Sequence, residues 1–253
     1  MGDVRLVITD IDCTLVAERA PDATPAVHAA MRAVQAKGIL VVAATSRPYE
    51  MARDLFLKLG FTGPSIFDGG ASIRDVTTSE LLWQNWLELP RLQAIARLVF
   101  PRAELVDFFP YFQYVSATEI KPEDLTEAAP YGWALVPKDS LAQITAELAK
   151  LPNLNVHPGV GWPEKPDQMD IQITDENSDK FHAVNALREL LHISRQETLA
   201  IGDGDNDIPL FKNAGLKLAM GNAIPELKAM ADYVVGSVDE DGWAEAMHRF
   251  VLS

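Results

Sequence analysis

The stretch that decides the fold lies near the start of the chain and reads Val4-Arg5-Leu6-Val7-Ile8-Thr9-Asp10-Ile11-Asp12-Cys13-Thr14-Leu15. Its apolar run, Leu6 to Ile8, is typical of a strand buried on both faces in a parallel sheet. Asp10 and Asp12 follow at the carboxyl end of this strand, where open α/β sheets bind their ligands. In extended backbone the two side chains point the same way, about 6.5–7 Å apart. One divalent cation or one phosphoryl group fits between them.

An ordinary alternative exists for this pair of acids. Aspartate is common in the turns that follow strands, and the stretch by itself favours neither interpretation. The remainder of the chain has to decide between a turn and a reactive site.

Composition limits the class of protein. The 253 residues are 48% hydrophobic, which supports a large core domain with a smaller insertion. The net charge of −14 disfavours nucleic acid and anionic membranes as partners. A single cysteine, Cys13, excludes an intrachain disulfide, and we find no signal-peptide pattern or long apolar run. These features predict a cytoplasmic protein and give no prediction of its oligomeric state.

The pattern after the first strand predicts a doubly wound α/β fold. Thr24 and Gly38 are typical of the two ends of a helix. The elements expected next are a helix over 26–37, a strand over 39–43, a helix over 49–59 and a strand over 64–67. This alternation favours a parallel sheet with right-handed crossovers. The strand over 64–67 ends at Asp68-Gly69-Gly70.

An aromatic-rich segment then interrupts this alternation. It contains two expected helices, 90–100 and 138–151, among short expected strands at 104–109, 112–116, 132–136 and 154–157. Two helices among several short strands predict an α+β module whose helices cover one face of an antiparallel sheet. We therefore expect a core domain over 1–81 and 168–253, with an inserted domain over 82–167.

Beyond the insertion the α/β alternation resumes. A helix is expected over 177–191 and a strand over 197–201, followed by Gly202-Asp203-Gly204-Asp205-Asn206-Asp207. The remaining elements expected are helices over 208–214, 225–231 and 242–252, with strands over 216–220 and 233–235.

Polar groups recur where the sheet topology brings them together. Besides Asp10 and Asp12 they are Thr45 and Ser46 after the second strand, Lys180 in a first helical turn, and Asp203 and Asp207 after a later strand. Because parallel strands end on one edge of a sheet, these groups converge there. Lys180 could instead be a surface lysine, and the acids from 203 to 207 a solvated turn. The spacing of those acids does not fit a calcium-binding EF-hand loop.

These residue types match the parts of a phosphoryl-transfer reaction. An aspartate can attack phosphorus and form an aspartyl-phosphate. A divalent metal is needed between the two anions, and oxygen-only ligands indicate Mg²⁺. A hydroxyl and an ammonium group can hold the other phosphoryl oxygens, while a second carboxylate transfers protons.

The motifs resemble those of a known family. Asp10-Ile11-Asp12-Cys13-Thr14-Leu15 resembles the first motif of the haloacid dehalogenase-like (HAD) phosphohydrolases, and Ala44-Thr45-Ser46-Arg47 resembles the second motif of their Cof-type branch. Lys180 lies where the third motif places its lysine, and 202–207 is similar to the fourth. The insertion is similar to the C2B-type cap of that branch, which selects the substrate.

The resemblance implies a role for each residue. Asp10 would be the nucleophile and Asp12 the general acid/base. Mg²⁺ would be held by the carboxylates of Asp10 and Asp203 and by the backbone carbonyl of Asp12, with Asp207 in a supporting position. The candidates for binding the phosphoryl group are Thr45, Ser46, Lys180, Asn206 and Arg47. For Arg47 we keep two alternatives, contact with substrate and capping of a loop.

Several positions depart from the family pattern. Cys13 and Ser46 stand where glycine is usual, as does Phe181 after the lysine of the third motif. Asp68-Gly69-Gly70 stands where Cof-type proteins tend to have Asn-Gly. No departure removes a catalytic group, but each changes the shape of a loop.

The sequence therefore predicts a Mg²⁺-dependent phosphatase that acts on a small phosphorylated metabolite, such as a sugar phosphate. A phosphotransferase resembling the phosphomutases would use the same nucleophile. A receiver-like signalling phosphoacceptor and a non-catalytic sugar-phosphate binder are alternatives from other classes. Release of phosphate without an added acceptor would distinguish the phosphatase from a phosphotransferase. A short-lived aspartyl-phosphate would distinguish it from a receiver-like phosphoacceptor, and turnover would distinguish it from a non-catalytic binder.

Overall fold

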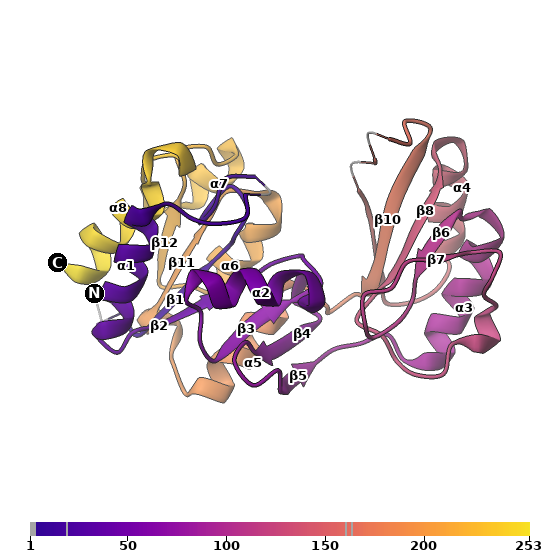
Figure 1. The fold of residues 1–253 in the computed structure, drawn as a ribbon, viewed down its shortest axis with the longest axis horizontal. Coiled ribbons are helices and arrows are strands. Elements are labelled where there is room, and N and C mark those ends of the chain that lie inside the picture. The colour runs from indigo at the N-terminus through magenta and orange to yellow at the C-terminus, as the bar shows by residue number, and fades with distance from the viewer. Residues whose placement is uncertain (1–3, 19, 160, 163) are drawn as a thin grey trace. The chain divides into compact units, whose positions relative to one another are not determined.

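The computed structural model describes residues 4–18, 20–159, 161–162 and 164–253. The chain divides into two compact units, the first formed by Met1–Trp83 and Asp179–Ser253 and the second by Gln84–Ser178. Figure 1 follows the chain through both units by colour. Each unit has its own sheet and its own buried apolar core.

The first unit contains the predicted parallel sheet. Its strands lie in the order β13-β12-β11-β1-β2, and every neighbouring pair is parallel. Their bounds are Leu6–Thr9 for β1, Leu40–Ala43 for β2, Thr198–Gly202 for β11, Leu216–Ala219 for β12 and Tyr233–Val234 for β13. The first strand therefore lies inside the sheet between β11 and β2, which explains its unbroken apolar run.

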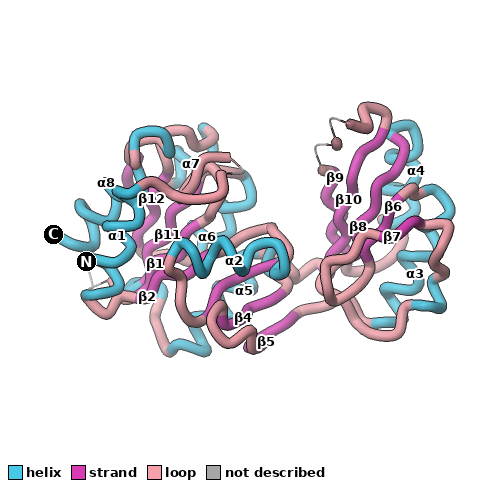
Figure 2. The backbone as a smooth tube through the Cα atoms, in the orientation of Figure 1, coloured by secondary structure: helices cyan, strands magenta, loops and turns pink. Residues whose placement is uncertain are grey.

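Helices of this unit begin and end within three residues of the predicted bounds, except that the last predicted helix is α-helical only as far as Met247. They are α1 (Pro25–Ala36), α2 (Tyr49–Leu59), α5 (Lys180–Leu191), α6 (Ile208–Lys212), α7 (Pro225–Met230) and α8 (Gly242–Met247), followed by a π-helical turn over His248–Leu252. Thr24 caps α1 by accepting the N–H of Val27, and Gly60 ends α2 in the left-handed conformation. Figure 2 shows these helices packed around the strands. Among the described residues, no helix is long and apolar enough to cross a membrane.

The pairing of the third strand differs from the prediction. β3 (Pro64–Phe67) pairs with β4 (Ser72–Asp75) in an antiparallel sheet that also contains β5 (Leu81–Gln84). A parallel bridge between Ala44 and Ile66 joins β3 to the end of β2. The turn Asp68–Gly70 reverses the chain after β3. The strand therefore forms a hairpin with β4 and does not extend the main sheet as another full-length strand. The sequence analysis predicted neither β4 nor β5.

The second unit is the predicted α+β module. Its antiparallel sheet has the order β7-β6-β8-β10-β9. The bounds are Leu105–Asp107 for β6, Val115–Ser116 for β7, Gly132–Pro137 for β8, Leu154–Pro158 for β9 and Gln168–Asp175 for β10, with helices α3 (Leu89–Val99) and α4 (Lys138–Leu148). Ile95 and Ile144 of the two helices share one core with the sheet residue Ile171. Both helices therefore cover the same face.

The boundary between the units differs from the expected one at 167/168. β10 pairs with β8 and β9, so residues 168–178 belong to the second unit. The strand alternates apolar Met169, Ile171 and Ile173 with polar residues, a pattern typical of a half-buried antiparallel strand. That alternation is the sequence signal that could have placed the boundary correctly.

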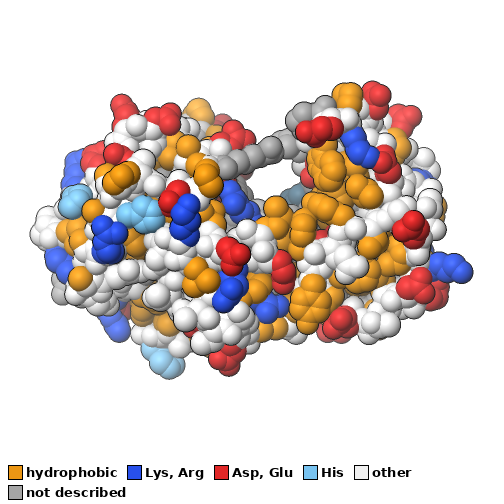
Figure 3. All heavy atoms as spheres, viewed as in Figure 1, with side chains coloured by type: hydrophobic (Ala, Val, Ile, Leu, Met, Phe, Trp, Pro, Cys, Tyr) orange, Lys and Arg blue, Asp and Glu red, His pale blue; other side chains and the backbone are white. Residues whose placement is uncertain are grey.

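Charge is dispersed on the face drawn in Figure 3. Lys and Arg side chains there lie singly or in small groups among acidic ones. This face therefore has no large basic patch to offset the net charge of −14.

Candidate active site

Three of the predicted acids lie together at the carboxyl edge of the main sheet. β1 and β11 are neighbours, so Asp10 after β1 lies beside the loop that carries Asp203 and Asp207 after β11. One carboxylate oxygen from each of the three lies within 4.8 Å of the others. This convergence follows from the parallel topology.

Lys180 connects two of these acids. It is the first residue of α5 and is 2% exposed. Its Nζ donates hydrogen bonds to Asp10 Oδ1 at 2.6 Å and to Asp207 Oδ1 at 2.7 Å. Burial by itself lowers the pKa of Lys180, but the charges of Asp10 and Asp207 outweigh that effect and raise it. The ammonium is therefore a fixed positive charge, despite its unfavourable place at a helix N-terminus.

The acids outnumber the cation that neutralises them. Burial and the neighbouring charge of Asp207 raise the pKa of Asp10, and burial raises that of Asp203. With all three acids ionised, one ammonium leaves two negative charges uncompensated. A divalent cation would supply the missing charge, and a set of carboxylate oxygens suits Mg²⁺. The donor set therefore fits the predicted cofactor.

Asp207 contacts the loop of Asp203 in addition to Lys180. Its Oδ2 accepts the backbone N–H groups of Asp203 at 2.9 Å and Gly204 at 3.1 Å. A Cβ at Gly202 would lie 2.5 Å from the Asp207 carboxylate carbon, so the glycine makes room for this side chain. These bonds to the loop favour a supporting role over direct binding of the metal.

Asp12 and Arg47 form an ion pair. The Arg47 Nε donates to Asp12 Oδ2 at 2.9 Å and its Nη2 to Asp12 Oδ1 at 2.5 Å. The side chain of Asp12 is therefore held by Arg47 and is not among the three clustered acids. Contact with substrate and capping of a loop both stay predictions for Arg47, and this ion pair adds a contact that we did not predict.

Three candidate phosphoryl-binding residues lie in the loops after β2 and β11. They are Thr45 and Ser46 after β2 and Asn206 after β11. Thr45 is buried, and its Oγ1 accepts the N–H of Arg47 at 3.1 Å, which leaves the hydroxyl proton free to be donated. Asn206 Nδ2 donates to Ser46 Oγ at 3.4 Å. The loops after β2 and β11 therefore meet through these two polar side chains.

The loop after β1 accommodates Cys13 in an unusual conformation. Its φ is 59°, in the left-handed region where glycine is favoured. Asn222 Nδ2 donates to the Cys13 carbonyl at 2.8 Å, and Thr14 Oγ1 donates to Asp203 Oδ1 at 2.7 Å. Burial and the charge of Asp203 raise the pKa of Cys13, which disfavours the thiolate that a nucleophile requires.

Sequence reasoning missed several residues that hold this site. Thr14 belongs to the first motif, and its position after the acids is the signal that could have identified it. Trp243 of α8 is 1% exposed and donates from Nε1 to Thr9 Oγ1 at 3.1 Å, while Thr9 Oγ1 donates to the carbonyl of Asp10 at 2.6 Å. No local pattern links residue 243 to residue 9, so this contact required the structure.

A buried acid outside the cluster is also noteworthy. Asp68 has φ 57° and accepts the N–H of Tyr49 at 3.3 Å, at the start of α2. Burial raises its pKa from 3.8 to about 7, partly opposed by a hydrogen bond from Ser72. The folded state therefore binds more protons than the unfolded state between these two values, and stability falls as the pH rises through that window.

We expect Asp68→Asn to stabilise the protein at about pH 8 by roughly 1–4 kcal/mol and to leave it unchanged at about pH 3. Asparagine keeps an acceptor oxygen and tolerates the left-handed conformation. Urea unfolding at both pH values measures the effect. Asp54→Asn is the control because its side chain is 95% exposed. A variant no more stable than wild type at about pH 8 would contradict the expectation.

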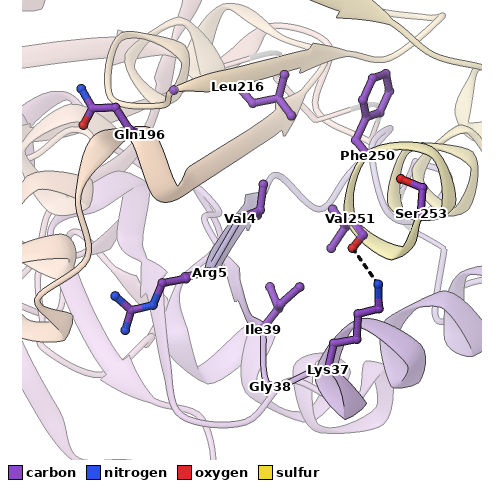
Figure 4. A pocket seen from close by; sticks show the side chains of 11 residues that line it. Val4, Arg5, Lys37, Gly38, Ile39, Gln196, Leu216, Phe250, Val251 and Ser253 are labelled. Carbon is purple, nitrogen blue, oxygen red and sulfur yellow. Dashed lines mark hydrogen bonds between the residues drawn. The ribbon is translucent and has the colours of Figure 1, made fainter. Parts of the chain in front are cut away.

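A cavity of about 700 Å³ lies elsewhere in the first unit. Figure 4 shows Val4, Arg5, Ile39, Leu216 and Phe250 around it. Val4, Ile39 and Leu216 lie at the amino ends of parallel strands, so the cavity is at the edge of the sheet opposite to the acids. We identify the candidate site by the clustered acids Asp10, Asp203 and Asp207, and not by this cavity, which contains none of them.

Comparison with known proteins assigns the family. The model of the haloacid dehalogenase-like hydrolases matches residues 7–113 and 111–247. The 5-amino-6-(5-phospho-D-ribitylamino)uracil phosphatase YcsE of Bacillus subtilis (strain 168) is 27% identical over 252 residues, covering 99% of this chain and 97% of that protein. Phosphoglycolate phosphatase 1 of Saccharolobus solfataricus is 26% identical over 253 residues, covering 98% and 96%.

A solved structure confirms the fold over almost the whole chain. It is that of a HAD subclass IIB sugar phosphatase, with a TM-score of 0.74 and 21% identity, covering 99% of this chain and 100% of the other. The fold and the site together define an α/β hydrolase with an inserted module. The chain belongs to the haloacid dehalogenase-like hydrolase family, as the four motifs predicted.

Proposed function

We propose that this hydrolase is a Mg²⁺-dependent phosphatase that hydrolyses a small phosphorylated metabolite through an aspartyl-phosphate on Asp10. The observation that carries the proposal is the buried arrangement of Asp10, Lys180 and Asp207 beside Asp203. The full-length relatives are phosphatases of a ribitylaminouracil phosphate and of phosphoglycolate. Their substrates share a phosphate monoester and little else, which supports the reaction class. The sugar phosphatase of similar fold makes sugar phosphates natural candidates.

The first step forms the covalent intermediate. A carboxylate oxygen of Asp10 attacks phosphorus while the bond from phosphorus to the leaving oxygen breaks. The leaving oxygen takes a proton from Asp12. Lys180 and Thr45 hold phosphoryl oxygens as their charge redistributes.

The second step regenerates the enzyme. Asp12, now ionised, removes a proton from water, which attacks the phosphorus of the aspartyl-phosphate. The bond between phosphorus and the Asp10 oxygen breaks, and inorganic phosphate leaves. Arg47 holds the Asp12 carboxylate through two hydrogen bonds, from Nε and from Nη2. Protonation of Asp12 for the first step requires this ion pair to open.

The cofactor would be held by the carboxylates of Asp10 and Asp203 and by the main-chain carbonyl of Asp12. When bound, Mg²⁺ neutralises charge between the nucleophile and the phosphoryl oxygens. Asp207 would keep Lys180 and the loop over 203–204 in place through its hydrogen bonds.

We expect the purified protein to release inorganic phosphate from p-nitrophenyl phosphate and from members of a sugar-phosphate and phosphoglycolate panel when Mg²⁺ is present. Excess EDTA should lower the rate at least about 100-fold, because the metal supplies several kcal/mol of charge stabilisation. Added Mg²⁺ should restore it. Full activity in EDTA would contradict the metal dependence. Phosphate release that requires an added acceptor would favour a phosphotransferase.

A further inference from the structure

We propose that the turn Asp68–Gly70 is a positioning element that fixes Thr45 and Lys180 relative to each other. This inference rests on the phosphoryl-binding roles proposed above for those two residues. The turn follows β3, contains no group that contacts the clustered acids, and lies between the loop after β2 and the first turn of α5. It contacts both of them directly, as the next two observations show.

On one side, the turn holds the loop that carries Thr45. The Asp68 N–H donates to the carbonyl of Arg47 at 3.1 Å, and the Gly69 N–H donates to the carbonyl of Thr45 at 3.2 Å. The Asp68 carboxylate accepts the N–H of Tyr49 at the start of α2. Three hydrogen bonds therefore fix the backbone from Thr45 to Tyr49 against the turn.

On the other side, the turn packs on the helix that carries Lys180. A Cβ at Gly70 would lie 2.2 Å from the carbonyl carbon of Asp179 and 2.7 Å from the backbone nitrogen of Lys180. No side chain fits at that distance, so the backbones themselves are in contact. The first turn of α5 therefore rests on Gly70.

The conformation of the turn supports this role. Asp68, Gly69 and Gly70 have φ values of 57°, 70° and 109°. All three values are positive, and residues other than glycine rarely have a positive φ. Glycine adopts such φ values without steric cost, so Gly69 and Gly70 permit a turn that would be strained with other residues at these positions. Because Lys180 begins α5, displacing the first turn of that helix displaces its ammonium from Asp10. Misplacement by about 1 Å can cost about 100-fold in rate.

The test compares two glycine variants at positions with positive φ, 109° at Gly70 and 75° at Gly63. Gly70→Ala adds a methyl group against Asp179. Gly63→Ala adds one at φ 75° just before β3, where no atom lies within 4 Å. Steady-state kinetics with p-nitrophenyl phosphate, binding of orthovanadate by thermal shift, and Mg²⁺ binding by calorimetry would be measured for both.

For Gly70→Ala we expect kcat/KM to fall at least about 100-fold and orthovanadate affinity at least about tenfold. Its Mg²⁺ affinity should not fall, because the turn does not contact Asp10 or Asp203 and moving the Lys180 ammonium away from Asp10 removes a positive charge from beside the metal ligands. Gly63→Ala should stay within about threefold of wild type in all three measurements. Equal losses in both variants would overturn the proposal. A parallel loss of Mg²⁺ and orthovanadate binding would overturn it as well, since that indicates general structural damage.

A second pair of variants covers the case in which Gly70→Ala does not fold. Asp68→Gly accepts the backbone conformation but removes the acceptor for the Tyr49 N–H, whereas Asp68→Asn keeps it. We expect kcat/KM to fall about three- to tenfold in Asp68→Gly and less than twofold in Asp68→Asn. Equal activity in the two would contradict the role of the turn. Orthovanadate binding needs no turnover. If the wild-type protein showed no phosphatase activity, the proposed function would be rejected, but the comparison of orthovanadate affinities would still test the role of the turn.

Discussion

Asp10→Asn is expected to lower kcat for p-nitrophenyl phosphate by at least about 10⁴-fold, because the amide cannot form the covalent intermediate. The substitution is nearly isosteric, and its carbonyl oxygen can still accept the Lys180 hydrogen bond. We therefore expect the variant to fold. Its free energy of unfolding should not fall, because a buried acid with a raised pKa is replaced by a neutral group. Kinetics with saturating Mg²⁺ and urea unfolding measure both effects.

The matched control for this variant is Asp205→Asn. Asp205 is exposed and lies in the loop between Asp203 and Asp207, so it tests the loss of one negative charge near the site. We expect its kcat to stay within about threefold of wild type. If Asp10→Asn were as active as Asp205→Asn, Asp10 would not be the nucleophile.

Lys180→Met is expected to remove both activity and stability. The methionine fills a similar volume but leaves Asp10 and Asp207 buried without their cation. Breaking a buried ion pair in this way costs about 3–5 kcal/mol. Added Mg²⁺ should recover part of that loss, because a cation bound only by the folded state stabilises it. Urea unfolding of the variant with Mg²⁺ and with EDTA measures this recovery.

Lys212→Met provides the control, because Lys212 is exposed at the end of α6. Its free energy of unfolding should change by less than about 0.5 kcal/mol, as for most surface substitutions. A Lys180→Met protein as stable as this control in EDTA would show that the buried acids do not depend on Lys180. Our account of the site electrostatics would then be wrong.

The sequence predicted the parts of the fold that depend on local signals. The apolar runs of β1 and β2 and the helix ends at Thr24 and Gly38 were sufficient, because burial and capping act within a few residues. The partner of β3 was not predicted, since strand pairing depends on the path of the chain after the turn at 68–70. The end of the second unit was missed for the same reason, because it depends on which strands pair with β10.

The candidate site shows a similar division. Convergence of Asp10, Lys180, Asp203 and Asp207 follows from parallel topology, which the sequence indicates. The contacts of Arg47 with Asp12 and of Gly70 with α5 do not follow from it. They depend on the direction of one side chain and on a backbone approach of a few ångströms, neither of which has a periodic signal in the sequence.

The covalent intermediate offers the most direct test of the central claim. Wild-type protein with Mg²⁺ and a substrate would be quenched in acid during turnover, and its peptides analysed by fragmentation mass spectrometry. Our account predicts one phosphoryl group on Asp10, present during turnover, absent after substrate is exhausted and absent in Asp10→Asn. A phosphoryl group on another residue, or turnover in Asp10→Asn at the wild-type rate, would contradict it.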